Sequence, residues 1–182
     1  ICAYWYEGHR LGDREMQDYA ALYTQSVDDV DTFWLNAAQH IAWDTPPQTA
    51  LDRSDAPFYH WYPDGRLNTC FNAVDRHVLA GRGAQNAIIY DSPITGAKRH
   101  ISFAELQQQT ARFAGMLARL GVQTGDRVII YMPMIPEAVV AMLGCARLGA
   151  VHSVVFGGFA AAELAKRIDD ATPQVIISAP CG

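Results

Sequence analysis

The sequence predicts an α/β fold in which parallel strands alternate with helices. Two continuous apolar runs, Val128–Met132 and Val175–Ile177, lack the polar–apolar alternation of a strand with one solvated face. Such runs are typical of strands that helices cover on both faces. A third apolar run, Val151–Phe156, lies between them, and helical stretches separate the three. We therefore predict a parallel βαβαβ unit with right-handed crossovers.

The first crossover helix is expected to begin at Pro136, because proline is tolerated in a first helical turn. Glu137 beside it favours the positive end of the helix dipole, and Gly149 supplies a stop signal. The apolar stripe between them consists of Val139, Val140, Leu143 and Ala146. In the second crossover helix, Leu164 and Ile168 mark the buried side, and Pro173 prevents the helix from continuing.

A further helix and a hairpin are expected upstream of this unit. Ser102 and Glu105 have the spacing of a capping box, and Gly121 ends the run of helical periodicity that follows. Before it, residues 87–90 and 99–101 flank a turn-rich loop, which predicts a β-hairpin. The apolar positions of the helix are Phe103, Leu106, Thr110, Phe113, Leu117 and Leu120.

The first eighty residues have a different composition. All four tryptophans and most tyrosines lie there, and prolines interrupt any periodicity. We predict one helix over Val27–Ala42, with Ser26 as its N-cap and aspartates in its first turn. The remainder is expected to be irregular chain that uses aromatic side chains for packing.

Bulk properties restrict the function classes. The 182 residues carry a net charge of −5 without a basic cluster, which argues against a nucleic-acid partner. No apolar stretch is long enough to span a bilayer, so no membrane partner is expected. The four cysteines (Cys2, Cys70, Cys145 and Cys181) lack metal-ligand spacing. We expect reduced thiols, and hence the cytoplasm or another reducing compartment such as the mitochondrial matrix.

Several motifs have both a structural and a functional interpretation. The Ser92–Lys98 segment contains residues typical of a phosphate loop, but its hairpin context favours a turn. The Asp75-Arg76-His77 run could be catalytic, but a capped or ion-paired helix is the simpler interpretation. His152, in an apolar strand, is expected to be a hydrogen-bonded core histidine. Core positions are also expected for Met116, Met132, Met134 and Met142.

The run Phe156-Gly157-Gly158 follows the middle strand of the predicted unit. It belongs to neither the G-x-G-x-x-G nor the G-x-x-x-x-G-K-[ST] phosphate-binding pattern. One interpretation is a tight strand-to-helix turn with no further role. The other is a backbone platform for an extended, largely uncharged ligand or for an anion at the helix N-terminus, since strand ends bind ligands in parallel sheets.

Five runs occur in a fixed order along the sequence: Asn72–His77, Gly125–Val128, Tyr131–Glu137, Cys145–Ala150 and His152–Phe159. With these runs, the sequence resembles the amino-terminal part of short-chain acyl-CoA synthetases, in the acetyl-CoA synthetase group of adenylate-forming enzymes. Within that group it is most like propionyl-CoA synthetase. The similarity extends from Tyr19 to Ser178 and leaves residues 1–18 outside.

The resemblance implies an architecture and a chemistry. Residues 1–82 would be an extension of the acetyl-CoA synthetase type, and residues 83–182 the start of a truncated AMP-binding large domain. The full-length enzyme would activate propionate or acetate with ATP and magnesium, and then transfer the acyl group to coenzyme A. Phe156, Gly157 and Gly158 would border the coenzyme A path, while the catalytic and metal-binding residues would lie beyond Gly182.

This fragment alone is then expected to be inactive, to bind no cofactor tightly, and to self-associate through an open sheet edge. The alternative from another class is a free-standing, non-catalytic ligand-binding or interaction module that uses the Gly157-Gly158 loop. A natural chain ending at Gly182 would favour that alternative.

Overall fold

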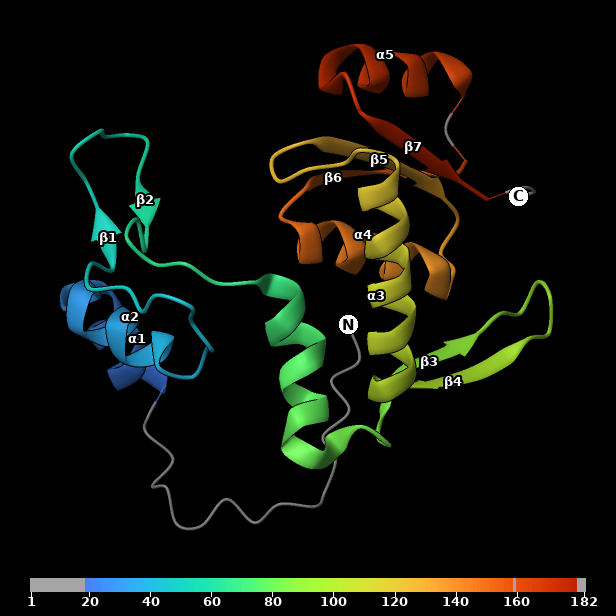
Figure 1. The fold of residues 1–182 in the computed structure, drawn as a ribbon. Helices are drawn as coiled ribbons and strands as arrows, with labels where there is room; N and C mark the ends of the chain where they lie inside the picture. The colour runs from blue at the N-terminus through green and yellow to red at the C-terminus, as the bar shows by residue number, and fades with distance from the viewer. Residues whose placement is uncertain (1–18, 159, 180–182) are drawn as a thin grey trace. The chain divides into compact units, whose positions relative to one another are not determined.

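The computed structural model describes residues 19–158 and 160–179 (Figure 1). These residues form two compact units, one ending at Arg66 and the other beginning at Leu67. Within the described ranges, no helix has both the length and the apolar character that crossing a membrane requires.

The second unit contains the predicted βαβαβ arrangement. Strands β5 (Arg127–Met132), β6 (Val151–Phe156) and β7 (Val175–Ser178) form a parallel sheet in the order β6-β5-β7. Helix α4 (Pro136–Leu148) connects β5 to β6, and α5 (Ala161–Ala171) connects β6 to β7. The α/β prediction is therefore confirmed, with Pro136 in the first turn of α4 and Gly149 in the left-handed conformation at its end.

Helices cover the two faces of this sheet unequally. Figure 1 shows α3 (Phe103–Arg119) and α4 on one face and α5 on the other. Strand β5 lies in the middle, and Val128, Ile129 and Ile130 are fully buried. Its core neighbours include Leu117, Ala138, Ala141 and Cys145.

The two outer strands are less well covered than their apolar sequences predict. In β7, Ile176 is 45% exposed, and in β6 only Val155 is fully buried. The expectation of cover on both faces therefore holds for β5 and is wrong for β7. Helix α5 contributes no fully buried residue and packs on the central strand, which leaves the outer strands partly in solvent.

The upstream hairpin and helix agree with the sequence-based expectation. Strands β3 (Asn86–Asp91) and β4 (Lys98–Ser102) pair antiparallel, and the intervening loop closes through hydrogen bonds between Ser92 and both Gly96 and Ala97. The turn interpretation of this loop is therefore confirmed. At the start of α3, both bonds of the Ser102–Glu105 capping box are present.

The helix prediction for the first unit is wrong. Helix α1 spans Tyr19–Asp28 and α2 spans Val30–Ala38, in place of one helix over Val27–Ala42. Asp29 breaks the run, because its side chain accepts a hydrogen bond from the Thr32 N–H (3.4 Å) and caps α2. Ser26 lies inside α1, where its hydroxyl donates to the Tyr23 carbonyl (2.7 Å).

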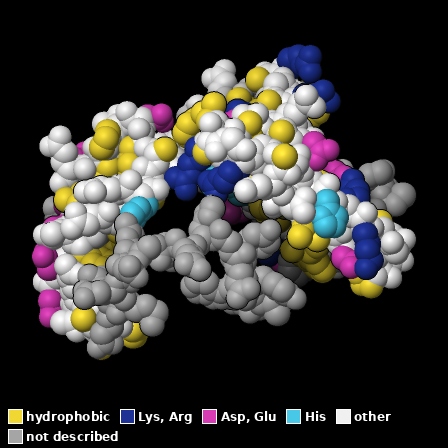
Figure 2. All heavy atoms as spheres, turned by 90° about the horizontal axis from the view of Figure 1, so that it is seen from below, with side chains coloured by type: hydrophobic (Ala, Val, Ile, Leu, Met, Phe, Trp, Pro, Cys, Tyr) yellow, Lys and Arg dark blue, Asp and Glu magenta, His cyan; other side chains and the backbone are white. Residues whose placement is uncertain are grey.

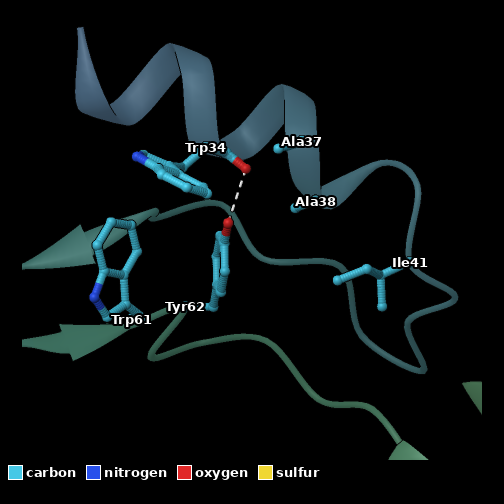
Figure 3. A pocket seen from close by; sticks show the side chains of 6 residues that line it. All are labelled: Trp34, Ala37, Ala38, Ile41, Trp61 and Tyr62. Carbon is cyan, nitrogen blue, oxygen red and sulfur yellow. Dashed lines mark hydrogen bonds between the residues drawn. The ribbon is translucent and has the colours of Figure 1, made fainter. Parts of the chain in front are cut away.

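Aromatic side chains of the first unit pack on one another beside a short ribbon, β1 (Leu51–Asp52) and β2 (His60–Trp61). Trp34 contacts Trp61 edge-on with ring centroids 5.4 Å apart, and the Tyr62 hydroxyl donates to the Trp34 carbonyl (2.9 Å). These groups line an apolar hollow (Figure 3). Trp5 lies outside the described residues.

Candidate functional site

The Phe156-Gly157-Gly158 run lies at the carboxyl end of β6, beside the end of β5. Phe156 is the register partner of Met132, and the Gly157 N–H donates to the Met132 carbonyl (3.3 Å). A Cβ at position 157 would lie 3.0 Å from the Pro133 nitrogen and 3.1 Å from the Met132 carbonyl carbon. Glycine is therefore favoured here, because a side chain would press against the backbone of the neighbouring strand end.

Gly158 has a different environment from Gly157. A Cβ at this position would lie 2.8 Å from the aromatic ring of Phe156. The ring therefore lies beside the bare backbone of Gly158, and Phe156 itself is 56% exposed. Together they present an aromatic surface and an unshielded peptide, which suit an extended ligand of low charge.

The neighbouring part of the sheet carries an exposed apolar side chain and an ion pair. Met134, which follows β5, is 82% exposed. Glu137, at the N-terminus of α4, pairs with Arg99 of β4 at 3.0 Å, and both side chains are about half exposed. Such an exposed pair contributes about 0–1 kcal/mol to stability. On the face shown in Figure 2, acidic and basic side chains lie among exposed hydrophobic ones without a continuous stripe of either charge.

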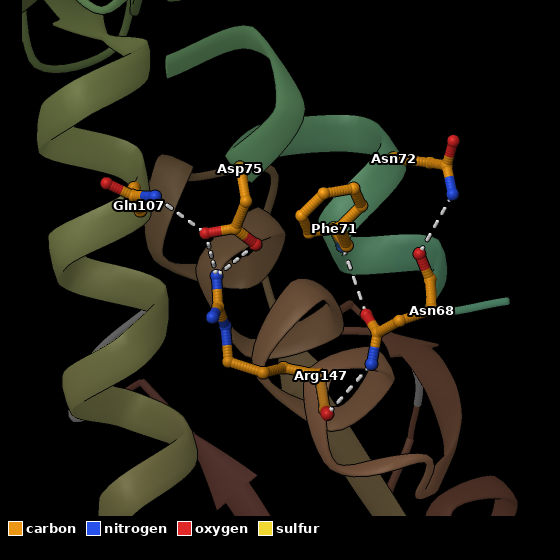
Figure 4. Close-up of polar contacts among 6 residues, drawn as sticks. All are labelled: Asn68, Phe71, Asn72, Asp75, Gln107 and Arg147. Atoms are coloured by element: carbon orange, nitrogen blue, oxygen red, sulfur yellow. Dashed lines mark hydrogen bonds and ion pairs between the residues drawn. The ribbon is translucent and has the colours of Figure 1, made fainter. Parts of the chain in front are cut away.

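A second group of polar residues lies away from that loop, around Asp75 (Figure 4). One guanidinium nitrogen of Arg147 donates to both carboxylate oxygens of Asp75, at 2.8 and 2.7 Å. The Gln107 amide donates to the same carboxylate at 2.7 Å. The Asp75 and Arg147 side chains are only 13% and 27% exposed. The ion-paired helix interpretation of the Asp75-Arg76-His77 run is thus confirmed.

Electrostatics at this group reflect burial and charge together. Burial is the largest single influence on Arg147 and opposes its charged form, but the hydrogen bonds and charges of Asp75 and Cys70 together outweigh burial and raise the pKa of Arg147. Cys70 is fully buried close by, and burial raises the pKa of its thiol. Burial, together with the charges of Arg82 and Arg76, lowers the pKa of His77, whose ring packs against Phe103 at 4.8 Å.

Three residues that we expected in the core, His152, Met134 and Met116, are exposed. His152 is exposed on β6, where it lines an open pocket of about 400 Å³, because no further element covers this side of the strand among the described residues. Met134 and Met116 are 82% and 38% exposed, whereas Met132 is buried and Met142 is partly buried. The other residues that line the pocket are Leu67, Asn68, Thr69, Ala146, Gly149, Ala150 and Val151.

Sequence reasoning missed the partner of Asp75. Arg147 is the penultimate residue of α4, a position that the helix dipole favours for a basic side chain. The pair joins two runs that lie 72 residues apart, so no local spacing reveals it. In the part of the chain that the structure describes, no three His, Cys, Asp or Glu side chains group as metal ligands would.

Comparison with known proteins assigns these elements to a family. The family model described as AMP-binding enzyme matches residues 75–181, which include the whole parallel sheet. The chain belongs to the AMP-binding enzyme family. A second model, described as acetyl-coenzyme A synthetase N-terminus, matches residues 19–73 directly before it.

Curated relatives of this AMP-binding enzyme chain match nearly all of it. An uncharacterised protein of Pseudomonas aeruginosa is 51% identical over 90% of the chain and 26% of its own length. The mitochondrial acyl-CoA synthetase short-chain family member 3 of Bos taurus is 47% identical over 91% of the chain and 24% of its own length. The acetyl-coenzyme A synthetase of Thiobacillus denitrificans is 50% identical over 90% of the chain and 25% of its own length. The chain thus spans about a quarter of the length of these relatives.

The matches confirm the resemblance to the amino-terminal part of short-chain acyl-CoA synthetases. Asp75 and Arg147, which form the buried ion pair, both lie in the segment that the AMP-binding enzyme model matches. The sheet edge with Phe156, Gly157 and Gly158 lies in that segment too.

Proposed function

We propose that this chain is the amino-terminal part of an AMP-forming acid–thiol ligase that acts on propionate or acetate. The consecutive matches to an acetyl-coenzyme A synthetase N-terminus and an AMP-binding enzyme carry this proposal. The names of the relatives from Bos taurus and Thiobacillus denitrificans support the short-chain class. Within it, residues 1–82 form the extension and residues 83–182 begin the large domain.

The reaction has two steps. A carboxylate oxygen of the substrate attacks the α-phosphorus of ATP, with magnesium present, and pyrophosphate leaves. The sulfur of coenzyme A then attacks the acyl carbon of the adenylate, and AMP leaves. Adenylation is needed because a free carboxylate is a poor electrophile, and the protein contributes mainly by positioning and by charge stabilisation.

The residues of this chain contribute to the second step. Phe156 and Gly158 present an exposed ring and bare backbone, which fit the extended and uncharged thiol-bearing arm of coenzyme A. Gly157, which has no side chain, lets the backbone turn after β6 pack closely against Met132 and Pro133. The catalytic residues and the magnesium site are assigned to the part of the natural protein outside this chain.

We propose a reducing compartment for this protein, and its thiols support that proposal. Cys70 and Cys145 are buried free cysteines, which fits the cytoplasm or the mitochondrial matrix. Cys2 and Cys181 lie outside the described residues.

The test uses the natural protein that contains this sequence. Pyrophosphate release should require propionate or acetate, and thioester formation should require coenzyme A as well. The chain of 182 residues alone should catalyse neither step. Phe156→Ala should raise the KM for coenzyme A and leave pyrophosphate release unchanged. Ile94→Ala, at a hairpin position that is 94% exposed, is the matched control.

Two results would refute the proposal. One is a natural protein that ends at Gly182, which would favour a non-catalytic binding module. The other is a longer protein that releases no pyrophosphate with either acid.

A further inference from the structure

We infer that Arg147, held by Asp75, is a positioning residue that fixes the amino end of β6 and thereby the Phe156–Gly158 loop at its other end. The expected effect on coenzyme A rests on the function proposed above. The effect on the strand itself does not, because it follows from contacts within the second unit.

Arg147 is tied to the segment before α3 through both its side chain and its backbone. Its guanidinium binds the Asp75 carboxylate, as described above, and its carbonyl accepts a hydrogen bond from the Asn68 side-chain amide (3.1 Å). The Asn68 side-chain oxygen in turn accepts from the Phe71 N–H (3.0 Å). Figure 4 shows that Asn68 and Asp75 contact Arg147 from the same helical segment.

Buried side chains hold that segment in the second unit. It contains the wide helical turns η1 (Phe71–Asp75) and η2 (Val78–Arg82), and Cys70 and Val74 are fully buried. Gln107 of α3 donates to the Asp75 Oδ1, one of the two carboxylate oxygens that Arg147 also contacts. The carboxylate therefore has a fixed position, which makes it a stable anchor for the end of α4.

The remaining carbonyls at the end of α4 are also bound. The Leu148 carbonyl accepts from the Thr124 hydroxyl (2.8 Å), and the Gly149 carbonyl accepts from the Gly125 N–H (2.9 Å). A Cβ at position 149 would lie 3.0 Å from the Thr124 methyl group. The helix end thus joins two separate segments, and the direction in which the chain enters β6 depends on both.

Strand β6 depends on its ends more than a central strand does. It is an edge strand that pairs only with β5 among the described strands, and Val155 is its one fully buried residue. At its start, the Val151 N–H donates to the Asp126 carbonyl (2.8 Å). Just after its last residue, the Gly157 N–H donates to the Met132 carbonyl. A displacement of the C-terminal end of α4 would therefore move β6, which is six residues long, and with it the Phe156–Gly158 loop.

The pair suits positioning better than an exposed ion pair would. An exposed pair exchanges freely with water, whereas removing one member of a buried pair leaves an uncompensated charge. Among the described residues, Asp75 is the ion-pair partner of Arg147. The Nε of Arg147 is buried without a hydrogen-bond partner, which adds to the cost of moving this side chain from its place.

The test compares Asp75→Asn and the conservative Arg147→Lys in the natural protein. The control is Asp91→Asn, which breaks an exposed pair with Lys98 in the hairpin. Amide hydrogen exchange should quicken in residues 151–158 for Asp75→Asn and less for Arg147→Lys, with β5 unchanged. The KM for coenzyme A should rise about tenfold in Asp75→Asn, while pyrophosphate release stays within about twofold.

The outcomes separate the two proposals. Unchanged exchange in residues 151–158 would overturn the positioning role, whatever the activity. Equal losses in both steps with an unchanged KM for coenzyme A would mean that the pair only stabilises the fold. A wild-type protein without thioester formation would refute the proposed function, and exchange would still decide the role of Arg147.

Discussion

The close approach at Gly157 makes a sharp prediction about stability. In Gly157→Ala, the new methyl group would lie 3.0 Å from the Pro133 nitrogen and 3.1 Å from the Met132 carbonyl carbon. Ordinary contacts are several tenths of an ångström longer, and both neighbours are backbone atoms that cannot rotate away. The strand ends must therefore separate, which weakens the hydrogen bond from Gly157 to Met132.

The expected cost is about 1–3 kcal/mol, the usual range for overpacking a close-packed site. Gly115→Ala is the matched control, because it lies within α3 and a Cβ there would meet nothing within 4 Å. Alanine is about 1 kcal/mol more favourable than glycine inside a helix. The same chemical change should therefore destabilise at position 157 and stabilise at position 115.

Urea unfolding of the chain, followed by far-ultraviolet circular dichroism, measures both effects. Trp34, Trp43 and Trp61 lie in the described part of the first unit, so their fluorescence reports that unit and should not change in either variant. An unfolding midpoint for Gly157→Ala at or above that of wild type would refute the packing argument. A shift of the same sign in both variants would do so as well.

Three other perturbations have expected outcomes. Ser102→Ala should cost about 0.5–2 kcal/mol, and an unchanged unfolding temperature at neutral pH would contradict this. The Ser102 backbone N–H and, to a lesser extent, its hydroxyl lower the pKa of Glu105 from 4.5, so their stabilisation is present above that pH and lost as pH falls through the lowered value. The variant keeps the backbone hydrogen bond, so its acid profile should differ from that of wild type only by the smaller share of the hydroxyl. Burial raises the pKa of Cys145 to about 11 and also raises that of Cys70, so iodoacetamide at about pH 8 should modify them only after unfolding, as peptide mass spectrometry would show. Ile176→Lys, on the edge strand β7, should reduce self-association in sedimentation velocity, and a wild-type chain that is monomeric at all concentrations would contradict the expectation of an open edge.

The parallel unit was predictable because each of its signals is local. Apolar runs, Pro136, Gly149 and the Ser102 capping box define elements without reference to distant contacts. Helix α1 gave no such signal, since none of its residues is fully buried. Ser26 and Asp29 are both good caps by type, and only the fold determines which one begins a helix.

The candidate site was predictable in position but not in detail. Two adjacent glycines indicate a tight loop, yet the sequence does not separate Gly157, which packs on β5, from Gly158, which lies beside Phe156. The exposure of His152 depends on what covers an edge strand, and the partner of Asp75 depends on long-range packing. These properties depend on contacts between segments that are distant in the sequence, and the periodicity of the sequence does not predict such contacts.

The central place of β5 has a consequence for the order in which the sheet can assemble during synthesis. Arg127 pairs with Val151, a separation of 24 residues, whereas Val128 pairs with Val175, a separation of 47. Closing the longer loop costs roughly 0.6 kcal/mol more, and β7 also leaves the ribosome later. Because β6 and β7 occupy opposite sides of β5, the β5–α4–β6 pair can fold first and then act as a template for the last strand.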